Sequence, residues 1–98
     1  KPGTNMKELG EEARAYYTAK YPDSLAFSIG HSMGLECEDA HILGTLGHVD
    51  APFEKNMVFE IEAWESYGGA LIGVEDTYVV TEDGCKKVTT IPKQIIER

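Results

Sequence analysis

Apolar residues near the start of the chain follow a helical spacing over residues 5–20. They recur three and four positions apart and form one stripe, made of Met6, Leu9, Ala13, Tyr16 and Tyr17. Asn5 and Glu8 resemble a capping box, in which each side chain binds a free backbone amide of the first turn. Pro22 follows, and the residue before a proline is disfavoured in helical geometry. The pattern therefore predicts one helix, and we interpret its tyrosines as packing residues rather than as catalytic groups.

Two segments after the helix alternate as strands do. Residues 25–29 place apolar side chains between small ones and run directly into Gly30 and His31. Glycine permits backbone angles that other residues avoid, so we expect His31 at a strand end or in a tight turn. Residues 57–64 alternate strictly, and their glutamates share a face with apolar neighbours: Val58, Glu60, Glu62 and Trp64. The strand alone favours solvent-facing glutamates, whereas the apolar Val58 and Trp64 on the same face favour a face that is at least partly covered.

The following segments predict a hairpin and a short closing strand. A β-branched run over residues 71–81 would pair antiparallel with the preceding strand through a turn at residues 65–69. Residues 81–84 form the next turn, in which Gly84 is available for a positive φ, and residues 85–90 close the sheet. Together the elements predict an α+β fold, with one amphipathic helix packed on a curved antiparallel sheet of about four strands.

The segment between the strand regions, residues 39–56, keeps no apolar period and is interrupted by glycines and a proline. Irregular segments of this length in small domains are usually functional or mobile loops. The segment carries His41 and His48, and His41 is the better candidate for binding substrate because it is nearer to His31 in the sequence. The alternative interpretation is that both histidines are solvated, which fits His48 at least as well.

Length and charge restrict the classes of partner. The chain has 98 residues, enough for one small domain, and a formal net charge of −8 from 9 basic and 17 acidic residues. This charge repels phosphate, so nucleic acids and anionic membranes are poor partners, and no run of about 20 apolar residues predicts a membrane span. Cys37 and Cys85 match no Cys-x-x-Cys pattern, which favours a reduced, cytoplasmic setting and leaves a disulfide open. The opening Lys1-Pro2-Gly3 lacks an initiator Met and is typical of a cut inside a longer protein.

One histidine and two strand glutamates form a set that suits a divalent metal ion. Imidazole nitrogen and carboxylate oxygen bind hard or borderline cations, and carboxylates are seldom buried without a partner. We therefore predict that His31, Glu62 and Glu75 converge on metal. Adjacent strand residues point to opposite faces, so only one of Glu75 and Asp76 can face this site.

Three motifs, taken in order, carry a family resemblance. They are Gly30-His31-Ser32-Met33-Gly34-Leu35, then Met57-Val58-Phe59-Glu60-Ile61-Glu62, then Val74-Glu75-Asp76-Thr77 ahead of Val79-Val80-Thr81-Glu82-Asp83-Gly84. In this order they resemble the pita-bread metallopeptidases, the family of methionine aminopeptidase, aminopeptidase P, prolidase and creatinase. The resemblance covers almost the whole chain, and it implies that residues 1–98 are the C-terminal half of a pita-bread catalytic domain.

The resemblance implies a dinuclear centre of two divalent ions (Mn, Co, Zn or Fe) in the complete protein. By their place in the motifs, His31 and Glu62 are implied to be terminal ligands, and Glu75 to bridge the two ions. Two further aspartate ligands are implied in the N-terminal half of the same domain. This chain alone is therefore expected to bind a metal pair poorly and to be inactive, since three ligands leave a second cation with too few anionic oxygens.

The activity implied by the resemblance is that of an Xaa-Pro aminopeptidase or dipeptidase, which cleaves a peptide or small amide with metal-activated water. Peptidases of the family carry a histidine seven residues after the ligand histidine. The prolyl-specific members carry a further histidine, which lies four residues before the ligand histidine. Here these positions are Glu38 and Phe27. Glu38 is thus the candidate catalytic residue, and a glutamate donates a proton only if burial or neighbouring acids raise its pKa.

Two other functions stay open. An acid at the place of Glu38, with Glu62 and Glu75 only 13 positions apart, is similar to a divergent branch that includes dimethylsulfoniopropionate lyase. In that branch a metal-supported base removes a proton in an elimination. Other relatives have lost ligands and serve as non-catalytic binding modules. The implied missing half also leaves an apolar sheet edge exposed, which predicts a homodimer or poor solubility of the isolated chain.

Overall fold

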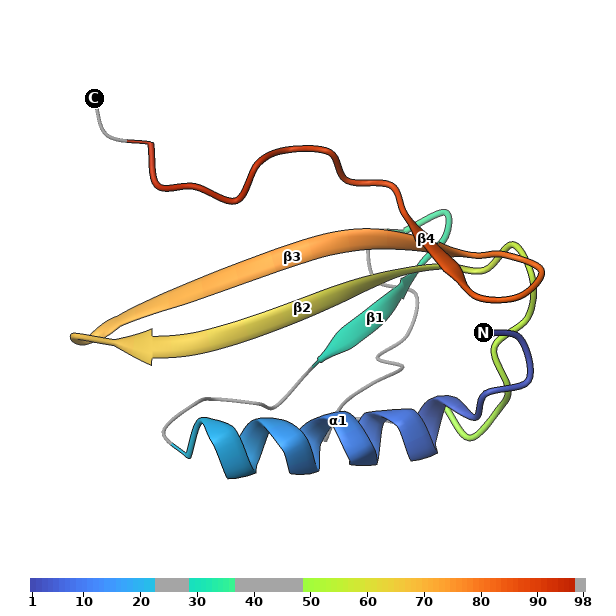
Figure 1. The fold of residues 1–98 in the computed structure, drawn as a ribbon, viewed down its shortest axis with the longest axis horizontal. Helices are drawn as coiled ribbons and strands as arrows, with labels where there is room; N and C mark the ends of the chain where they lie inside the picture. Colours follow the sequence, from blue (N-terminus) through green and yellow to red (C-terminus); the bar gives the residue numbers. More distant parts are fainter. Residues whose placement is uncertain (23–28, 37–48, 97–98) are drawn as a thin grey trace.

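One helix and four strands make up the architecture, seen in a computed structural model that describes residues 1–22, 29–36 and 49–96. The elements in chain order are α1 (Met6–Lys20), β1 (Gly30–Met33), β2 (Val58–Tyr67), β3 (Ala70–Val80) and β4 (Cys85–Lys87). All strands pair antiparallel in the order β1-β2-β3-β4, and α1 runs beneath the long β2–β3 hairpin (Figure 1). The predicted α+β fold is therefore confirmed. Among the described residues, no helix has the length and apolarity to cross a membrane.

Helix α1 begins as its sequence predicts. The Asn5 side chain accepts hydrogen bonds from the amides of Lys7 (2.9 Å) and Glu8 (3.1 Å), which satisfies two free donors of the first turn. Met6 is buried at the start of the apolar stripe. Tyr16, in contrast, is 59% exposed, and its hydroxyl accepts a hydrogen bond from the Lys20 ammonium. The prediction that Tyr16 packs was wrong, because only the first half of the helix contributes to the core.

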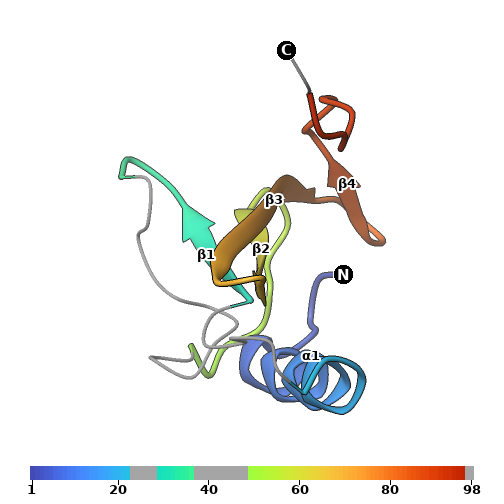
Figure 2. The same ribbon diagram turned by 90° about the vertical axis from the view of Figure 1, so that its left-hand side faces the viewer.

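The core lies between α1 and one face of the sheet. Its buried members come from distant parts of the sequence: Met6, Ile29, Phe53, Phe59 and Val80. The Phe59 ring centroid is 5.1 Å from that of Phe53 and 5.8 Å from that of Tyr78. Seen end-on, the sheet is strongly curved, and α1 occupies one side of it only (Figure 2). The other side of the sheet is not covered by α1.

Several element boundaries differ from the prediction. The β2–β3 turn consists of Gly68 and Gly69 alone, both with positive φ (58° and 81°), while the preceding residues extend β2. Gly84 has no positive φ. Of the two places expected for His31, the structure shows the strand end, since His31 is the second residue of β1 and pairs with β2. The strand predicted over residues 25–29 falls almost wholly outside the described residues.

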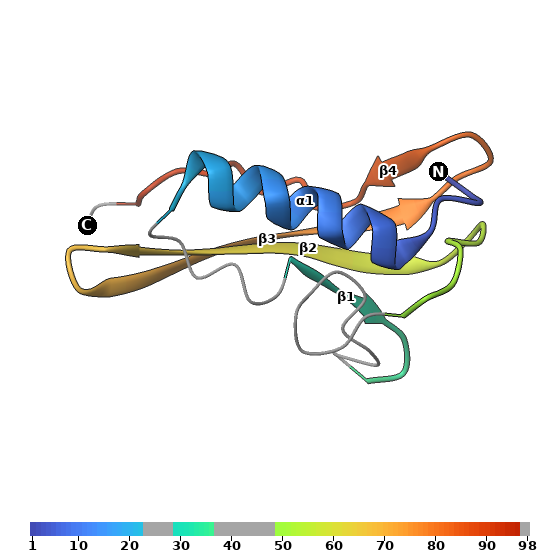
Figure 3. The ribbon, with the colours of Figure 1, turned by 90° about the horizontal axis from the view of Figure 1, so that it is seen from below.

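The pairing register decides which side chains share a face. Phe59 and Tyr78 are direct partners, and both point toward α1 and the core. Residues one position away point to the opposite side, which we call the ligand face: His31 on β1, Glu60 and Glu62 on β2, and Glu75 and Thr77 on β3. The view from below shows α1 crossing the sheet on the core side (Figure 3). The ligand face is thus not covered by the helix.

Candidate metal centre

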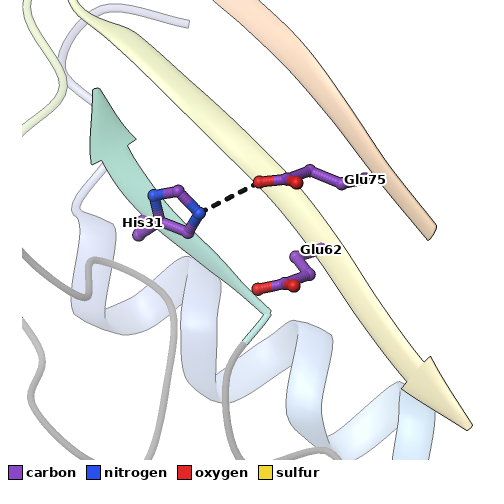
Figure 4. A group of neighbouring side chains, drawn as sticks. All are labelled: His31, Glu62 and Glu75. Atoms are coloured by element: carbon purple, nitrogen blue, oxygen red, sulfur yellow. Dashed lines mark hydrogen bonds and ion pairs between the residues drawn. The ribbon is translucent and has the colours of Figure 1, made fainter. Parts of the chain in front are cut away.

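Three neighbouring strands each place one possible ligand at the same point of the ligand face. His31 comes from β1, Glu62 from β2 and Glu75 from β3, and Glu62 and Glu75 are direct partners in the register. One ligand atom from each of the three groups lies within 4.8 Å of the others (Figure 4). The convergence expected from the sequence is therefore present in the fold.

The His31 ring is held in place on both of its nitrogens. The residue is 5% exposed; Nε2 lies 3.1 Å from Glu75 Oε1, and Nδ1 lies 3.3 Å from the carbonyl oxygen of Ser32. Both contacts are hydrogen bonds only when the ring carries two protons. In the neutral tautomer with a proton on Nδ1, the Ser32 carbonyl orients the ring and Nε2 has a free lone pair. That tautomer is the form in which His31 can bind a metal.

The geometry and chemistry of the three groups fit a divalent cation. A cation bound at about 2.0–2.2 Å from each ligand atom holds those atoms at most about 4.4 Å apart. Small rotations of the glutamate side chains reach this spacing from the present one, and the Glu75 side chain is 48% exposed and has room to move. One imidazole nitrogen with carboxylate oxygens suits borderline and hard divalent metals.

A hollow of about 470 Å³ surrounds the three groups. Its described lining has one histidine, three glutamates and no lysine or arginine: His31, Met33, Glu60, Glu62, Glu75, Thr77 and Thr89. With neutral histidine and ionised glutamates, this lining carries a charge of −3. A site of this sign attracts cations and repels anionic ligands.

Asp76 does not take part in this site. Its side chain is buried on the core side of β3, where Lys87 Nζ lies 2.9 Å from Oδ1 and Lys93 Nζ lies 2.5 Å from Oδ2. Hydrogen bonds from Lys93 and Lys87 hold the pKa of Asp76 below its usual value. The prediction that only one of the adjacent acids faces the site is confirmed, and the one that does is Glu75.

Glu60 is the functional candidate that the sequence did not single out. It is 4% exposed, it lines the hollow, and its Oε1 accepts a hydrogen bond of 2.7 Å from the Thr77 hydroxyl. Glu60 and Glu62 are two positions apart, so they lie on one face of the strand. This alternation was the feature of the sequence that could have identified Glu60. The other two candidates, Glu38 and His41, lie outside the described residues, as does His48.

Residues 30–34 also match the pattern Gly-x-Ser-x-Gly, which occurs in serine hydrolases. In those enzymes the serine lies on a sharp turn between a strand and a helix. Here Ser32 lies within β1 and alternates with His31, so it faces the core side of the sheet. The match therefore does not indicate a serine nucleophile.

Comparison with known proteins identifies the family of this chain. The model of metallopeptidase family M24 matches residues 1–82. Over 98% of its length, the chain is 33% identical to the uncharacterized peptidase YqhT of Bacillus subtilis (strain 168). Over the same share it is 30% identical to the Xaa-Pro dipeptidase of Pyrococcus furiosus. It spans only 27% and 28% of the length of these two relatives.

Solved structures give the same result for the fold. The structure of an Xaa-Pro dipeptidase from Bacillus anthracis superimposes with a TM-score of 0.79 at 31% sequence identity. The superposition covers 98% of this chain and 27% of that one. The helix and curved antiparallel sheet are therefore part of a pita-bread fold, as the motifs implied.

Proposed function

Because the chain belongs to metallopeptidase family M24, we propose that it forms the metal-binding part of a hydrolase that cleaves Xaa-Pro peptides. The observation that carries this proposal is the convergence of His31, Glu62 and Glu75 within 4.8 Å. The similarity to two proteins named as Xaa-Pro dipeptidases supports the substrate class. The three groups come from three strands of one sheet, so their spacing is set by the backbone ladder and needs little rearrangement on binding.

Each ligand has a distinct role in the proposed site. His31 supplies a neutral nitrogen, whose direction is set by the Ser32 carbonyl behind the ring. Glu62 and Glu75 would supply anionic oxygens to the bound metal. When bound, the metal supplies a Lewis acid that activates water for attack on the carbonyl carbon of the scissile amide. In the hydrolysis the C–N bond breaks, and the leaving amine takes a proton that derives from the water.

The proposed centre needs groups from outside this chain. Three protein ligands leave a second cation short of anionic oxygens, so we propose that two aspartates from the N-terminal part of the same domain complete the site. The chain spans about a quarter of its relatives, which is consistent with a missing part of the domain. Glu38 stays the proposed proton donor and His41 a proposed substrate contact. The proposed metals are Mn, Co, Zn or Fe, and the proposed setting is the cytoplasm.

The test replaces the ligands in the complete protein. We expect His31→Ala and Glu62→Gln each to reduce hydrolysis of an Xaa-Pro dipeptide at least about 100-fold, because each removes a bond to the cation that activates water. Bound metal, measured by inductively coupled plasma mass spectrometry after gel filtration, should fall in parallel. Glu11→Gln makes the same chemical change as Glu62→Gln on the exposed surface of α1 and should alter neither quantity.

The outcome also separates the competing functions. Wild-type turnover in either ligand variant would show that the ligand assignment is wrong. An alkene product in place of an amine and an acid would identify a metal-assisted lyase. A complete protein that binds no divalent metal would instead be a binding module.

A further inference from the structure

Glu60 is a buried carboxylate at the centre of the ligand face, outside the three converging ligands. In the sheet register it is the direct partner of His31 on β1 and of Thr77 on β3. It therefore lies between the strand that carries the histidine and the strand that carries Glu75. It lines the same hollow as the three ligands, but it is not a member of the group whose atoms lie within 4.8 Å.

A chain of hydrogen bonds holds Glu60 in place. The Thr77 hydroxyl donates to Glu60 Oε1 at 2.7 Å, and the Thr77 amide donates to Thr89 Oγ1, also at 2.7 Å. The Val88 amide donates to the Thr77 carbonyl at 2.8 Å, which ties the segment after β4 to the same point of β3. A carboxylate offers about four acceptor sites, so a single hydroxyl leaves capacity for a donor inside the hollow.

Glu60 is buried without a described cationic partner. Burying a carboxylate costs free energy unless it is paired, and the contact described for it is a neutral hydroxyl. The described residues around the hollow include no lysine or arginine. A purely structural link to Thr77 would work equally well with a neutral glutamine. Such a link does not explain why a third acidic side chain lies on the same face as the two ligand glutamates.

We infer that Glu60 is a positioning residue for the divalent cation, held by the Thr77 hydroxyl, which contributes negative charge to the site and accepts a hydrogen bond from water in the hollow. The inference rests on the proposed function, since it presupposes that His31, Glu62 and Glu75 bind metal. Outer-shell groups that hydrogen-bond metal ligands commonly change metal affinity by about 10- to 100-fold, and we expect a buried carboxylate beside the three ligands to have an effect of that order. Glu60 thus acts on the cation from outside the three ligands.

The experiment compares Mn²⁺ affinity in variants of the complete protein by isothermal titration calorimetry. Glu60→Gln keeps the shape and removes the charge, and we expect it to weaken Mn²⁺ binding about 10- to 100-fold. Thr77→Val keeps the Glu60 carboxylate and removes the hydroxyl that holds it. This variant should also weaken Mn²⁺ binding, by a smaller factor. Thr77→Ser restores the hydroxyl and should bind like the wild type. Glu11→Gln is the matched surface control.

Thermal unfolding without and with Mn²⁺ provides a second readout. Bound metal raises the melting temperature by an amount that grows with the logarithm of its affinity, so the gain should shrink in Glu60→Gln while the metal-free melting temperature stays the same or rises. An equal loss of melting temperature with and without Mn²⁺ would show a merely structural role and overturn the inference. So would Mn²⁺ binding by Glu60→Gln that equals the wild type. If the wild type itself binds no Mn²⁺, the proposed function fails as well, so the two failures are distinguishable.

Discussion

The indole of Trp64 occupies the space above Gly73, its direct partner in the β2–β3 register. A Cβ atom at residue 73 would lie 2.8 Å from Cε3 and Cζ3 of the indole and 2.9 Å from Cη2. Carbon atoms do not approach this closely, so the glycine is required by the aromatic ring across the ladder. Glycine in a strand interior is otherwise unfavourable, and an aromatic partner commonly covers it. The pair lies on the ligand face, next to Glu62 and Glu75 along the two strands.

Gly73→Ala should therefore displace the indole and lower the free energy of unfolding by about 1–2 kcal/mol, as overpacking does. Trp64 is the only tryptophan of the chain, so a shift in intrinsic fluorescence reports its movement directly. Gly84→Ala is the matched control, because a Cβ there meets only Thr81 Oγ1 at 3.9 Å. An unchanged emission spectrum together with unchanged unfolding would contradict this account of the pair.

At the scale of the elements, the ion cluster of Asp76, Lys87 and Lys93 joins β3, β4 and the segment after it. Asp76 is buried, and the two ammonium groups contact different oxygens of its carboxylate. Asp76 is adjacent to Glu75, so the cluster also anchors the part of β3 that presents Glu75 on the opposite face. The alternation of the strand thus places a stabilising contact on one side and a proposed ligand on the other.

The lowered pKa of Asp76 predicts a pH-dependent contribution to stability. In the unfolded chain the carboxyl titrates near its ordinary value of about 3.9. Its folded pKa is lower, so the contribution is fully present above about pH 4 and is lost as the pH falls through the folded pKa. Urea unfolding of the metal-free protein should show Asp76→Asn to be less stable than wild type near neutral pH.

That difference in stability should shrink in acid. Asp83→Asn, on the exposed turn between β3 and β4, should show no comparable pH dependence. A stability difference between Asp76→Asn and wild type that stays constant from neutral to acidic pH would contradict the assignment of the ion cluster.

At the scale of the whole molecule, the core covers only part of the sheet. Beyond Phe59, the core-side face of the hairpin carries apolar residues that are a third to a half exposed: Ile61, Ile72 and Val74. Three isoleucines of the C-terminal segment are more exposed still: Ile91, Ile95 and Ile96. Exposed apolar patches of this kind are typical of surfaces that contact another protein part.

The isolated chain should therefore self-associate in a concentration-dependent way, as measured by sedimentation velocity. Replacing Ile72 and Val74 together by lysine should shift the distribution toward the monomer, since charges oppose burial of the patch. Leu71→Lys makes a similar change on the opposite face of the same hairpin and should have less effect. A wild-type chain that stays monomeric at every concentration would contradict the prediction.

Local patterns in the sequence predicted most of the architecture and the three side chains that converge on the ligand face. The Asn5 cap and the spacing of Met6 and Leu9 specify α1, because they act between residues a few positions apart. The alternation of β2 placed Glu60 and Glu62 on one face for the same reason. The prediction failed for Tyr16, because only the first half of α1 packs into the core, and for residues 65–67, which pair with β3 instead of turning.

The amino-acid sequence by itself determined that this chain is an α+β part of a pita-bread metallopeptidase domain, with one histidine and two strand glutamates as its metal-binding candidates. Only the tertiary structure decided that His31 stands opposite Glu60, that Thr77 holds Glu60, and that Lys87 and Lys93 neutralise Asp76. Periodicity and capping depend on near neighbours and can be read along the chain. Strand register and ion pairing join residues that are distant in sequence, so they arise only when the packed sheet brings those residues together.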